Sequence, residues 1–505
     1  MENSKLIPLL QSLDKEEFKL FGRFVKSKVY NPNKNLIKLY EELKKYYPEF
    51  RERNIEQEKI YERIFPGKPF HIGIMRNLIS DMMQLVKDFF VYYEFSKDSF
   101  RQKYYLLKEL NKKDLYKFFE KEYSFAETAY KKNKIFDERL ELDMNDIYGV
   151  RAKYLLKNLP TGKVFKYYEM VGKQVDKLSL FFIVASLKNY FNLLCGKSHS
   201  NHEVNLTFKD EIISHIEKNK EKYFSIPIID VLYNFIMLVE KGTDDKLYEI
   251  VKKKVYDNEK AIQEKDLKNL FLELVNYSTR RELAGDRKFV KEQFDIEKEM
   301  LACGLYFDEE GYLSSHAYNN IAVTAINSKE FDWAEKFLYD YKDKLRRKER
   351  NNAYNYNLAL KFYIQGNTSS EPSQRIYFYE TALNLLTMVR IDDFYYEIMV
   401  KNLQIQMYFE MDELQRTIFF LDTLKHFLKK NKDMPRDLKE RYKNFANFVH
   451  HLIKLKSGSD KISIDEFRKM VVEEENLSYR PWLTKEANKI EAERKKRKDH
   501  KVPIA

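Results

Sequence analysis

Residues 318–347 decide the fold, and they read YNNIAVTAINSKEFDWAEKFLYDYKDKLRR. The stretch contains two amphipathic helical patterns separated by a short polar turn at 327–330. Small side chains, Ala322 and Ala325 in the first helix and Ala334 in the second, let two antiparallel helices approach closely. The residues predicted to pack this hairpin are Tyr318, Ala322, Ala325, Phe331, Ala334 and Leu338. Because one hairpin cannot bury its apolar face alone, the stretch predicts stacked neighbours.

The pattern returns further along the chain. Residues 353–363 repeat the first-helix pattern, and we expect an insertion at 366–373 to delay the partner helix. Residues 394–409 and 413–427 form the next predicted hairpin. The packing residues predicted for these two hairpins are Ala359, Ala382, Tyr408 and Leu421. The first helices recur at a spacing of roughly forty residues, which is within the range of helical arrays.

Residues 318–347 resemble a tetratricopeptide repeat. The resemblance rests on the small residues Ala322 and Ala334, with an aromatic residue at Tyr318 and a second helix that starts at Phe331. It implies an α-solenoid of stacked hairpins that binds peptides or protein surfaces in a concave groove, and it implies no chemistry. Other segments show the pattern only loosely, so the resemblance is carried mainly by this one repeat.

Composition favours an all-α protein. The 505 residues include only 13 Gly and 11 Pro, too few for the many turns of a strand-rich protein. Aromatic residues make up 15% and charged residues 34%, which is typical of helices with a thick apolar stripe and a charged outer face. The predicted segments are a small helical N-terminal domain at 1–96, degenerate hairpins at 97–310, tetratricopeptide-like repeats at 311–456 and a helical cap with a basic tail at 457–505.

The chain shows neither a disulfide framework nor a targeting segment. Its two cysteines, Cys195 and Cys303, lack metal-ligand spacing, and we expect reduced, buried thiols. The N-terminus has no apolar run of the signal-peptide type. The apolar stretches 178–187 and 226–239 are short or interrupted, which argues against a membrane span. We therefore expect a cytoplasmic protein.

A net charge of +12 permits contact with nucleic acid, which is the alternative function. Two segments could provide it. One is the long predicted helix near 72–95, whose candidate base-reading residues are Arg76, Asn77, Ser80 and Gln84. Asp81 and Asp88 share that surface and would repel phosphates. The other is the basic tail, where the possible phosphate contacts are Arg494, Lys495, Lys496, Arg497 and Lys498.

Signatures of catalysis are missing from the sequence. It contains no GxxxxGK[ST] or GxGxxG phosphate loop and no GxSxG elbow. His199 and His202 lie in a polar loop at 196–207 without the spacing of a metal site, so we expect no metal and no cofactor. An enzyme is not expected. A deep pocket holding a desolvated carboxylate or histidine would favour that third alternative.

These observations favour a non-catalytic interaction scaffold or adaptor. Its partner would be a protein or peptide held on the helical-repeat surface, because stacked hairpins offer extended concave faces. The sequence does not identify that partner.

Overall fold

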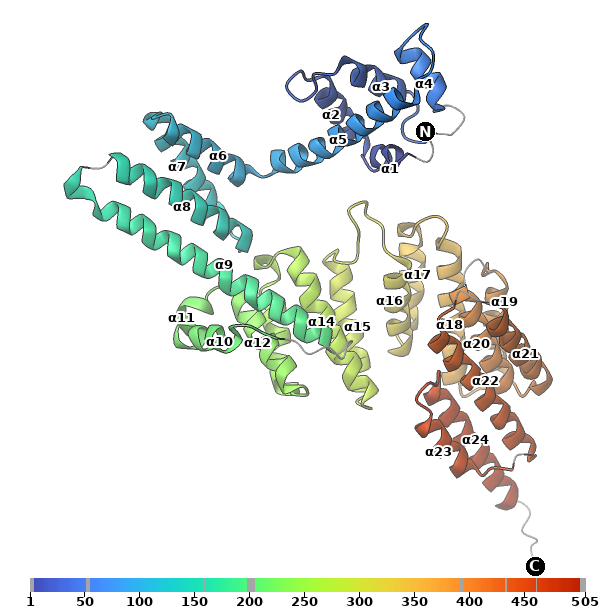
Figure 1. Ribbon diagram of the computed structural model, residues 1–505. Coiled ribbons are helices and arrows are strands. Elements are labelled where there is room, and N and C mark those ends of the chain that lie inside the picture. Colours follow the sequence, from blue (N-terminus) through green and yellow to red (C-terminus); the bar gives the residue numbers. More distant parts are fainter. Residues whose placement is uncertain are drawn as a thin grey trace, which may run out of the picture. The chain divides into compact units, whose positions relative to one another are not determined.

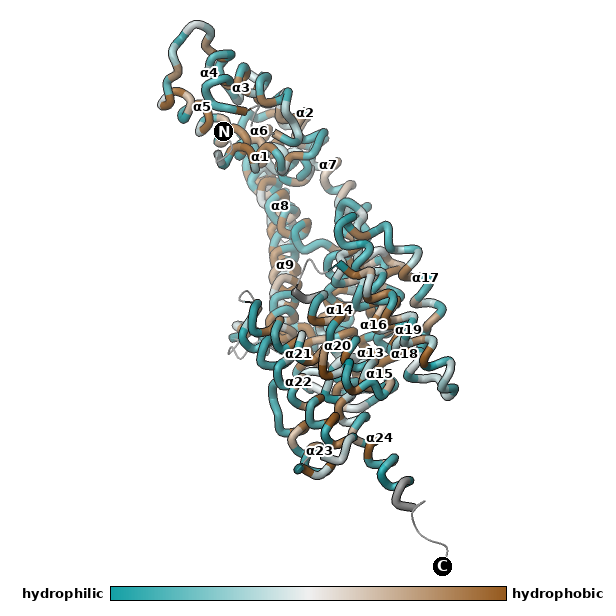
Figure 2. Tube along the Cα trace, turned by 90° about the vertical axis from the view of Figure 1, so that its right-hand side faces the viewer, coloured by the Kyte–Doolittle hydropathy of each residue, from teal (hydrophilic) through white to brown (hydrophobic). Residues whose placement is uncertain are grey.

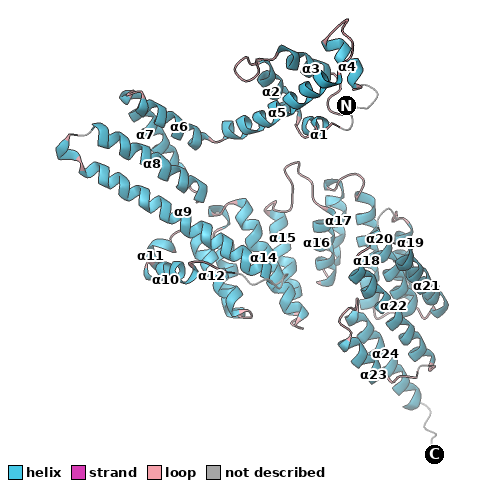
Figure 3. Cartoon of the chain, viewed as in Figure 1, coloured by secondary structure: helices cyan, strands magenta, loops and turns pink. Residues whose placement is uncertain are grey.

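The computed structural model describes residues 4–50, 55–158, 160–197, 205–390, 394–431, 434–459 and 461–499. Over these residues the chain forms the α-helices α1 to α24, a few 3-10 turns and one isolated antiparallel bridge between Phe307 and Leu313. The described ranges contain helices and loops but no β-strand (Figure 3). The predicted all-α class is confirmed. Hydrophobic and hydrophilic residues alternate along most of the helices, as amphipathic packing requires (Figure 2).

The chain divides into two compact units, residues 1–263 and residues 264–505, whose helices are labelled in Figure 1. The four segments expected from the sequence divide the chain more finely. Their boundaries stay predictions, although the one at 96 lies one residue before the end of α5 and the one at 456 one residue before the end of α22.

The first unit begins with five helices that share one core: α1 (Leu6–Gln11), α2 (Lys15–Lys26), α3 (Lys34–Lys44), α4 (Gln57–Ile64) and α5 (Ile72–Lys97). Asp14 caps α2, and Glu17 completes a capping box, as its position in the sequence predicts. Phe18, Phe21 and Val25 then recur on one face and are buried. The capped start therefore fixes which face of α2 enters the core.

The rest of the first unit consists of α6 (Ser99–Lys112), α7 (Tyr116–Lys132), α8 (Glu138–Asn158), α9 (Phe165–Lys197), α10 (Lys209–Lys218), α11 (Lys220–Tyr223), α12 (Pro227–Lys241) and α13 (Asp245–Asp257). The long helix α9 packs against α8 and α12. Two ion pairs join it to α8: Lys177 with Glu141 at 2.8 Å, and Lys188 with Glu138 at 2.6 Å. Its polar residues are thus used to attach it to a neighbouring helix.

The second unit consists of α14 (Glu264–Leu283), α15 (Lys288–Ala302), α16 (Ser315–Asn327), α17 (Phe331–Tyr341), α18 (Arg350–Thr368), α19 (Pro372–Thr387), α20 (Phe394–Glu410), α21 (Leu414–Lys430), α22 (Arg436–Ser457), α23 (Ile464–Glu473) and α24 (Arg480–Asp499). Helices that follow one another in the chain pack side by side (Figure 1). Short connections between them leave little room for any other arrangement.

The stretch that decides the fold forms α16 and α17. The turn between them passes through Lys329, whose φ of 62° lies in the left-handed region. Ala322 and Ala334 are fully buried, so the two helices lie close together. The hydroxyl of Tyr318 donates a hydrogen bond of 2.6 Å to the carbonyl oxygen of Leu338, which joins the first helix to the second.

The expected insertion at 366–373 is absent. Helix α18 runs on to Thr368, and α19 already begins at Pro372. Gly366 lies inside α18, and a Cβ atom there would be 2.6 Å from Cε1 of Tyr379. The glycine therefore lets α18 approach α19 closely and is not a breaker.

The expectation of two buried thiols is also corrected. Cys195 is half-buried, whereas Cys303 is exposed. Cys303 is the C-cap residue of α15, beyond the last buried position of that helix, Leu301. The apolar periodicity that buries its neighbours has ended at that point.

Candidate functional site

Two open hollows flank the C-terminal half of α21. The first lies between α20 and α21 and has a volume of about 960 Å³. It is lined by Glu397, Lys401, Phe419, Asp422, Thr423, His426, Phe427, Lys430 and Asn431. The second lies between α21 and α22 and has a volume of about 460 Å³. It is lined by Lys425, Leu428, Lys429, Arg436, Lys439, Glu440, Lys443 and Asn447, and we call it the basic groove.

Side chains of α21 face the core, the first hollow or the basic groove, depending on their position along the helical repeat. Residues three or four positions apart share a face, so Leu421, Leu424 and Leu428 point into the core. Phe419 and His426 face the first hollow, and the residues around Lys425 face the basic groove. The same helix therefore contributes to the core and to two surface sites.

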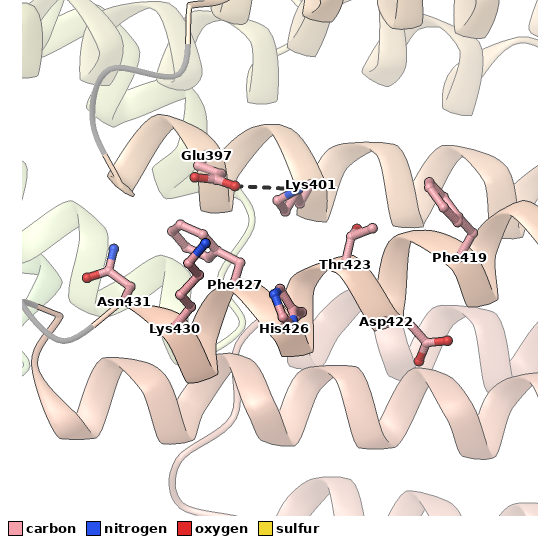
Figure 4. A pocket seen from close by; sticks show the side chains of 9 residues that line it. All are labelled: Glu397, Lys401, Phe419, Asp422, Thr423, His426, Phe427, Lys430 and Asn431. Atoms are coloured by element: carbon pink, nitrogen blue, oxygen red, sulfur yellow. Dashed lines mark ion pairs between the residues drawn. The ribbon is translucent and has the colours of Figure 1, made fainter.

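The first hollow has mixed character (Figure 4). Glu397 and Lys401 on α20 form an ion pair of 3.5 Å across one helical turn. The Thr423 hydroxyl donates a hydrogen bond of 2.9 Å to the carbonyl oxygen of Phe420. Phe419 is 61% exposed at one end of the hollow. An exposed aromatic ring beside paired charges can pack against another protein.

The basic groove carries five cationic side chains and a single carboxylate, that of Glu440. Among the residues that the structure describes, none of the five cations has a hydrogen bond or ion pair to another side chain. The charge of Lys425 also acts on His450 of α22. Burial lowers the pKa of His450, and the charges of Lys425 and Lys454 lower it further, while Asp422 opposes them.

Charged side chains also gather in the interior of the second unit. Glu410 ends α20, and its side chain is only 3% exposed. Its carboxylate accepts hydrogen bonds from the Tyr363 hydroxyl at 2.7 Å and the Tyr379 hydroxyl at 2.8 Å. The indole N–H of Trp482 donates another at 2.8 Å, and Lys489 lies 3.4 Å away. These donors come from α18, α19 and α24, so the cluster attaches α24 to three other helices.

Burial raises the pKa of Glu410, but Lys489, Lys485 and the hydrogen-bond donors lower it more, so it lies below its usual range. The neighbouring carboxyl of Glu486 has a raised pKa because of its burial and the charge of Glu410. Lys489 also pairs with Glu486 at 2.6 Å. Lys485 and Lys489 border a third, shallow hollow of about 730 Å³ on α24. Since the bonding capacity of Glu410 is used up by fixed donors, this cluster holds helices together.

A desolvated carboxylate is present elsewhere in the second unit, in α15. Burial raises the pKa of Glu297 to about 7. Glu297 lines none of the three hollows described above. The expectation that the protein is not an enzyme stays a prediction.

The predicted packing residues lie mostly inside the second unit. The fully buried ones are Tyr318, Ala322, Ala325, Ala334, Leu338, Ala359, Ala382 and Leu421. Phe331 and Tyr408 are partly buried. Tyr408 stacks on Phe420 with ring centroids 5.2 Å apart, so its ring contact is with the neighbour of the predicted Leu421.

The predicted phosphate contacts of the tail are partly engaged. Arg494 donates a hydrogen bond to the carbonyl oxygen of Leu455, and Lys495 pairs with Glu491 at 2.9 Å. Lys496 is exposed, while the side chains of Arg497 and Lys498 lie outside the described residues. The loop with His199 and His202 also lies outside them.

The candidate base-reading face of the first unit lies on α5, where the exposed residues are Arg76, Asn77, Ser80, Asp81, Gln84 and Asp88. The amide of Gln84 donates a hydrogen bond of 2.9 Å to the carboxylate of Asp88. Both carboxylates lie on the surface that would have to approach the phosphates. Binding of nucleic acid at this face stays a prediction.

Helix α9 has an apolar exposed face. In the described part of the chain it alone is long and apolar enough to cross a membrane by length and composition, and 28% of its most apolar window is buried. The apolar stretch is longer than the segment 178–187 expected from the sequence, because Lys188 is the only charged residue between Leu178 and Cys195. That lysine forms an ion pair with Glu138 of α8, which is typical of a helix packed against protein.

Three comparisons with known proteins found nothing: no family model matches this chain, and neither does a curated protein or a solved structure.

Proposed function

We propose that this protein is a non-catalytic interaction scaffold of the cytoplasm, and that its second unit is a tetratricopeptide-like stack that binds a protein partner beside α21. The observation that carries the proposal is the pair of hollows on either side of α21. They are formed between helices that follow one another in the chain, which is where stacked hairpins offer binding surface.

The side chains around these hollows are suited to binding rather than to chemistry. In the first hollow the hydroxyl of Thr423 is bonded to a backbone carbonyl, and Glu397 is paired with Lys401. An exposed ring at Phe419 adds apolar area at the rim. Interfaces commonly combine aromatic anchors with a polar rim of this kind.

Photo-crosslinking in the native host tests the proposal. A benzophenone amino acid replaces Phe419, which is 61% exposed in the first hollow, or Tyr377, which is 62% exposed on α19 and lines neither hollow. We expect a discrete set of protein adducts from position 419 that position 377 does not give. The same adducts from both positions, or none from position 419, would contradict the proposal.

A further inference from the structure

The basic groove between α21 and α22 has an excess of positive charge that the protein leaves uncompensated. Its five cations face one carboxylate, and none of them is paired within the described chain. Elsewhere in the same unit lysines near carboxylates do form pairs, as Lys456 does with Asp412 at 2.7 Å. Like charges held together repel one another, so an occupant with negative charge is favoured there.

The cations are arranged along the groove at helical spacing. Arg436, Lys439 and Lys443 recur on one face of α22, and Lys425 and Lys429 lie one turn apart on α21. From Arg436 to Asn447 the lining of α22 extends over about 16 Å, which is three turns of helix. A partner helix laid along the groove, with a carboxylate at about every turn, would bring each carboxylate close to a cation.

The groove is not uniformly polar. Leu428 is the one apolar residue of its lining, and it is only 6% exposed because most of its side chain lies in the core. Lys425 and Lys439 are only partly exposed, so their methylene stems border the hollow while their charged ends can reach water. An occupant that fits both features has apolar side chains on the face it buries and carboxylates beside them.

Nucleic acid fits these features less well. The lining residues include no aromatic ring on which a base could stack, and Glu440 would repel a phosphate chain. A volume of about 460 Å³ takes a few side chains of a peptide. The lysine stems that border the hollow favour apolar side chains over a hydrated backbone of phosphates.

We infer that the basic groove binds an acidic amphipathic helix of a protein partner, with its carboxylates against the five cations and its apolar side chains against the lysine stems beside Leu428. The inference rests on the proposed scaffold function and names the chemistry of the partner. It requires no movement of α21 or α22, because the groove is already open.

Fluorescence anisotropy on the full chain tests the inference. The probe is a labelled helical peptide of about 18 residues with a leucine stripe flanked by glutamates, and a second probe has glutamine at each glutamate. We expect the glutamate probe to bind at least about tenfold more tightly than the glutamine probe. Equal binding of the two probes, or no binding of the glutamate probe, would overturn the inference.

Paired charge reversals locate the binding. The groove variant combines Lys429→Glu with Lys443→Glu, both at exposed positions. The control combines Lys298→Glu with Lys336→Glu, which are exposed on α15 and α17 and line none of the described hollows. We expect the groove variant to lose at least about tenfold in affinity and the control less than about threefold. Equal losses would mean general attraction to a basic protein.

A variant that gains affinity is needed as well, because the loss of affinity in the groove variant could also come from misfolding. Glu440→Gln removes the one carboxylate of the groove and should tighten binding of the glutamate probe. No gain would count against the groove as the binding site. A single-stranded DNA of about 20 nucleotides that displaces the peptide at lower concentration, with a steep salt dependence, would assign the groove to nucleic acid instead.

The two proposals can fail separately. If the probes do not bind but the crosslinks from Phe419 persist, the scaffold function stands and the acidic partner does not. If position 419 gives no protein adducts, the proposed scaffold function fails, whether or not the peptide probes bind.

Discussion

Two groups of charged side chains within residues 264–505 differ in their burial and in their hydrogen-bond and ion-pair partners. The Glu410 carboxylate is buried beside that of Glu486 and accepts hydrogen bonds from donors on three helices. In the basic groove five cations have no hydrogen bond or ion pair to another side chain among the residues that the structure describes. The first arrangement stabilises the fold because its removal would leave buried groups unpaired. The second gives the fold no ion pair among the described residues, and the use that we infer for its cations is to bind an acidic partner.

The largest effect is expected from Glu410→Gln. The change removes the negative charge beside Lys489 and disturbs the bonds from Tyr363 and Trp482, so we expect a loss of about 3 kcal/mol in unfolding free energy. Urea denaturation followed by Trp482 fluorescence, in a Trp333→Phe background, measures it, since the chain has two tryptophans. The matched Glu440→Gln should lose less than about 0.5 kcal/mol. Equal midpoints for the two variants would show that the Glu410 cluster does not hold the fold.

The pH dependence of that loss has a defined sign. The pKa of Glu410 is lowered in the folded protein, so its contribution to stability is present above the unfolded pKa of about 4.3 and is lost as the pH falls through the folded value. The stability difference between the wild type and Glu410→Gln should therefore shrink below about pH 4. A difference that grew in acid would contradict the assignment of Glu410 as the charged partner.

Glu297 sharpens the comparison, because it is buried with no cation beside it among the described residues and with only a long hydrogen bond of 3.4 Å from the Gln293 amide. One of its carboxylate oxygens has no hydrogen-bond partner, and burial raises its pKa to about 7. A raised carboxyl pKa means that stability is full below about pH 4.3 and falls as the pH rises through 7. At about pH 8, Glu297→Gln should therefore be more stable than the wild type by up to about 3 kcal/mol, and the two should converge near about pH 4.

Thermal denaturation at the two pH values measures the effect of Glu297→Gln, and Glu440→Gln serves again as the exposed control. A variant less stable than the wild type at about pH 8 would mean that the ionised form of Glu297 is useful to the fold, and burial alone would not describe its surroundings.

Gly366 tests the packing next to Glu410. A Cβ atom at this position would be 2.6 Å from the ring of Tyr379, which is buried and bonded to Glu410. Gly366→Ala should therefore cost about 2 kcal/mol, the opposite of the usual gain from alanine in a helix. Gly172→Ala in α9 is the matched control, because nothing lies within 4 Å of the added atom. It should gain up to about 1 kcal/mol. A gain at both positions would show that α18 and α19 can move apart.

Local features of this fold could be predicted from the sequence, whereas the charged groups could not. The capping box at Asp14 and the hairpin at 318–347 depend on residues within a few turns of one another. The donors to Glu410 are separated from it by up to 79 positions, and only the packing of α24 brings Lys489 there. Gly366 looks like a helix breaker in the sequence, but in the structure it lies inside α18 and makes room for the ring of Tyr379.

The basic groove was missed for a related reason. Charged residues make up 34% of the chain, and in sequence Lys429 resembles dozens of other lysines. What distinguishes it is that it forms no ion pair with a carboxylate among the described residues, which depends on how α21 lies against α22. Spacing along one helix does not reveal the charges on its neighbour.

The smallest effect is expected in the groove itself. If its cations repel one another, Lys429→Glu should raise the unfolding free energy by a few tenths of a kcal/mol at low salt, because the new carboxylate lies one turn from Lys425. Lys298→Glu, which introduces the same charge away from the groove, should not. The gain should fade at about 1 M salt, where exposed charges are screened. Urea midpoints at the two salt concentrations measure it, and a loss of stability at low salt would show that Lys429 stabilises the C-terminal turn of α21 more than the neighbouring cations destabilise it.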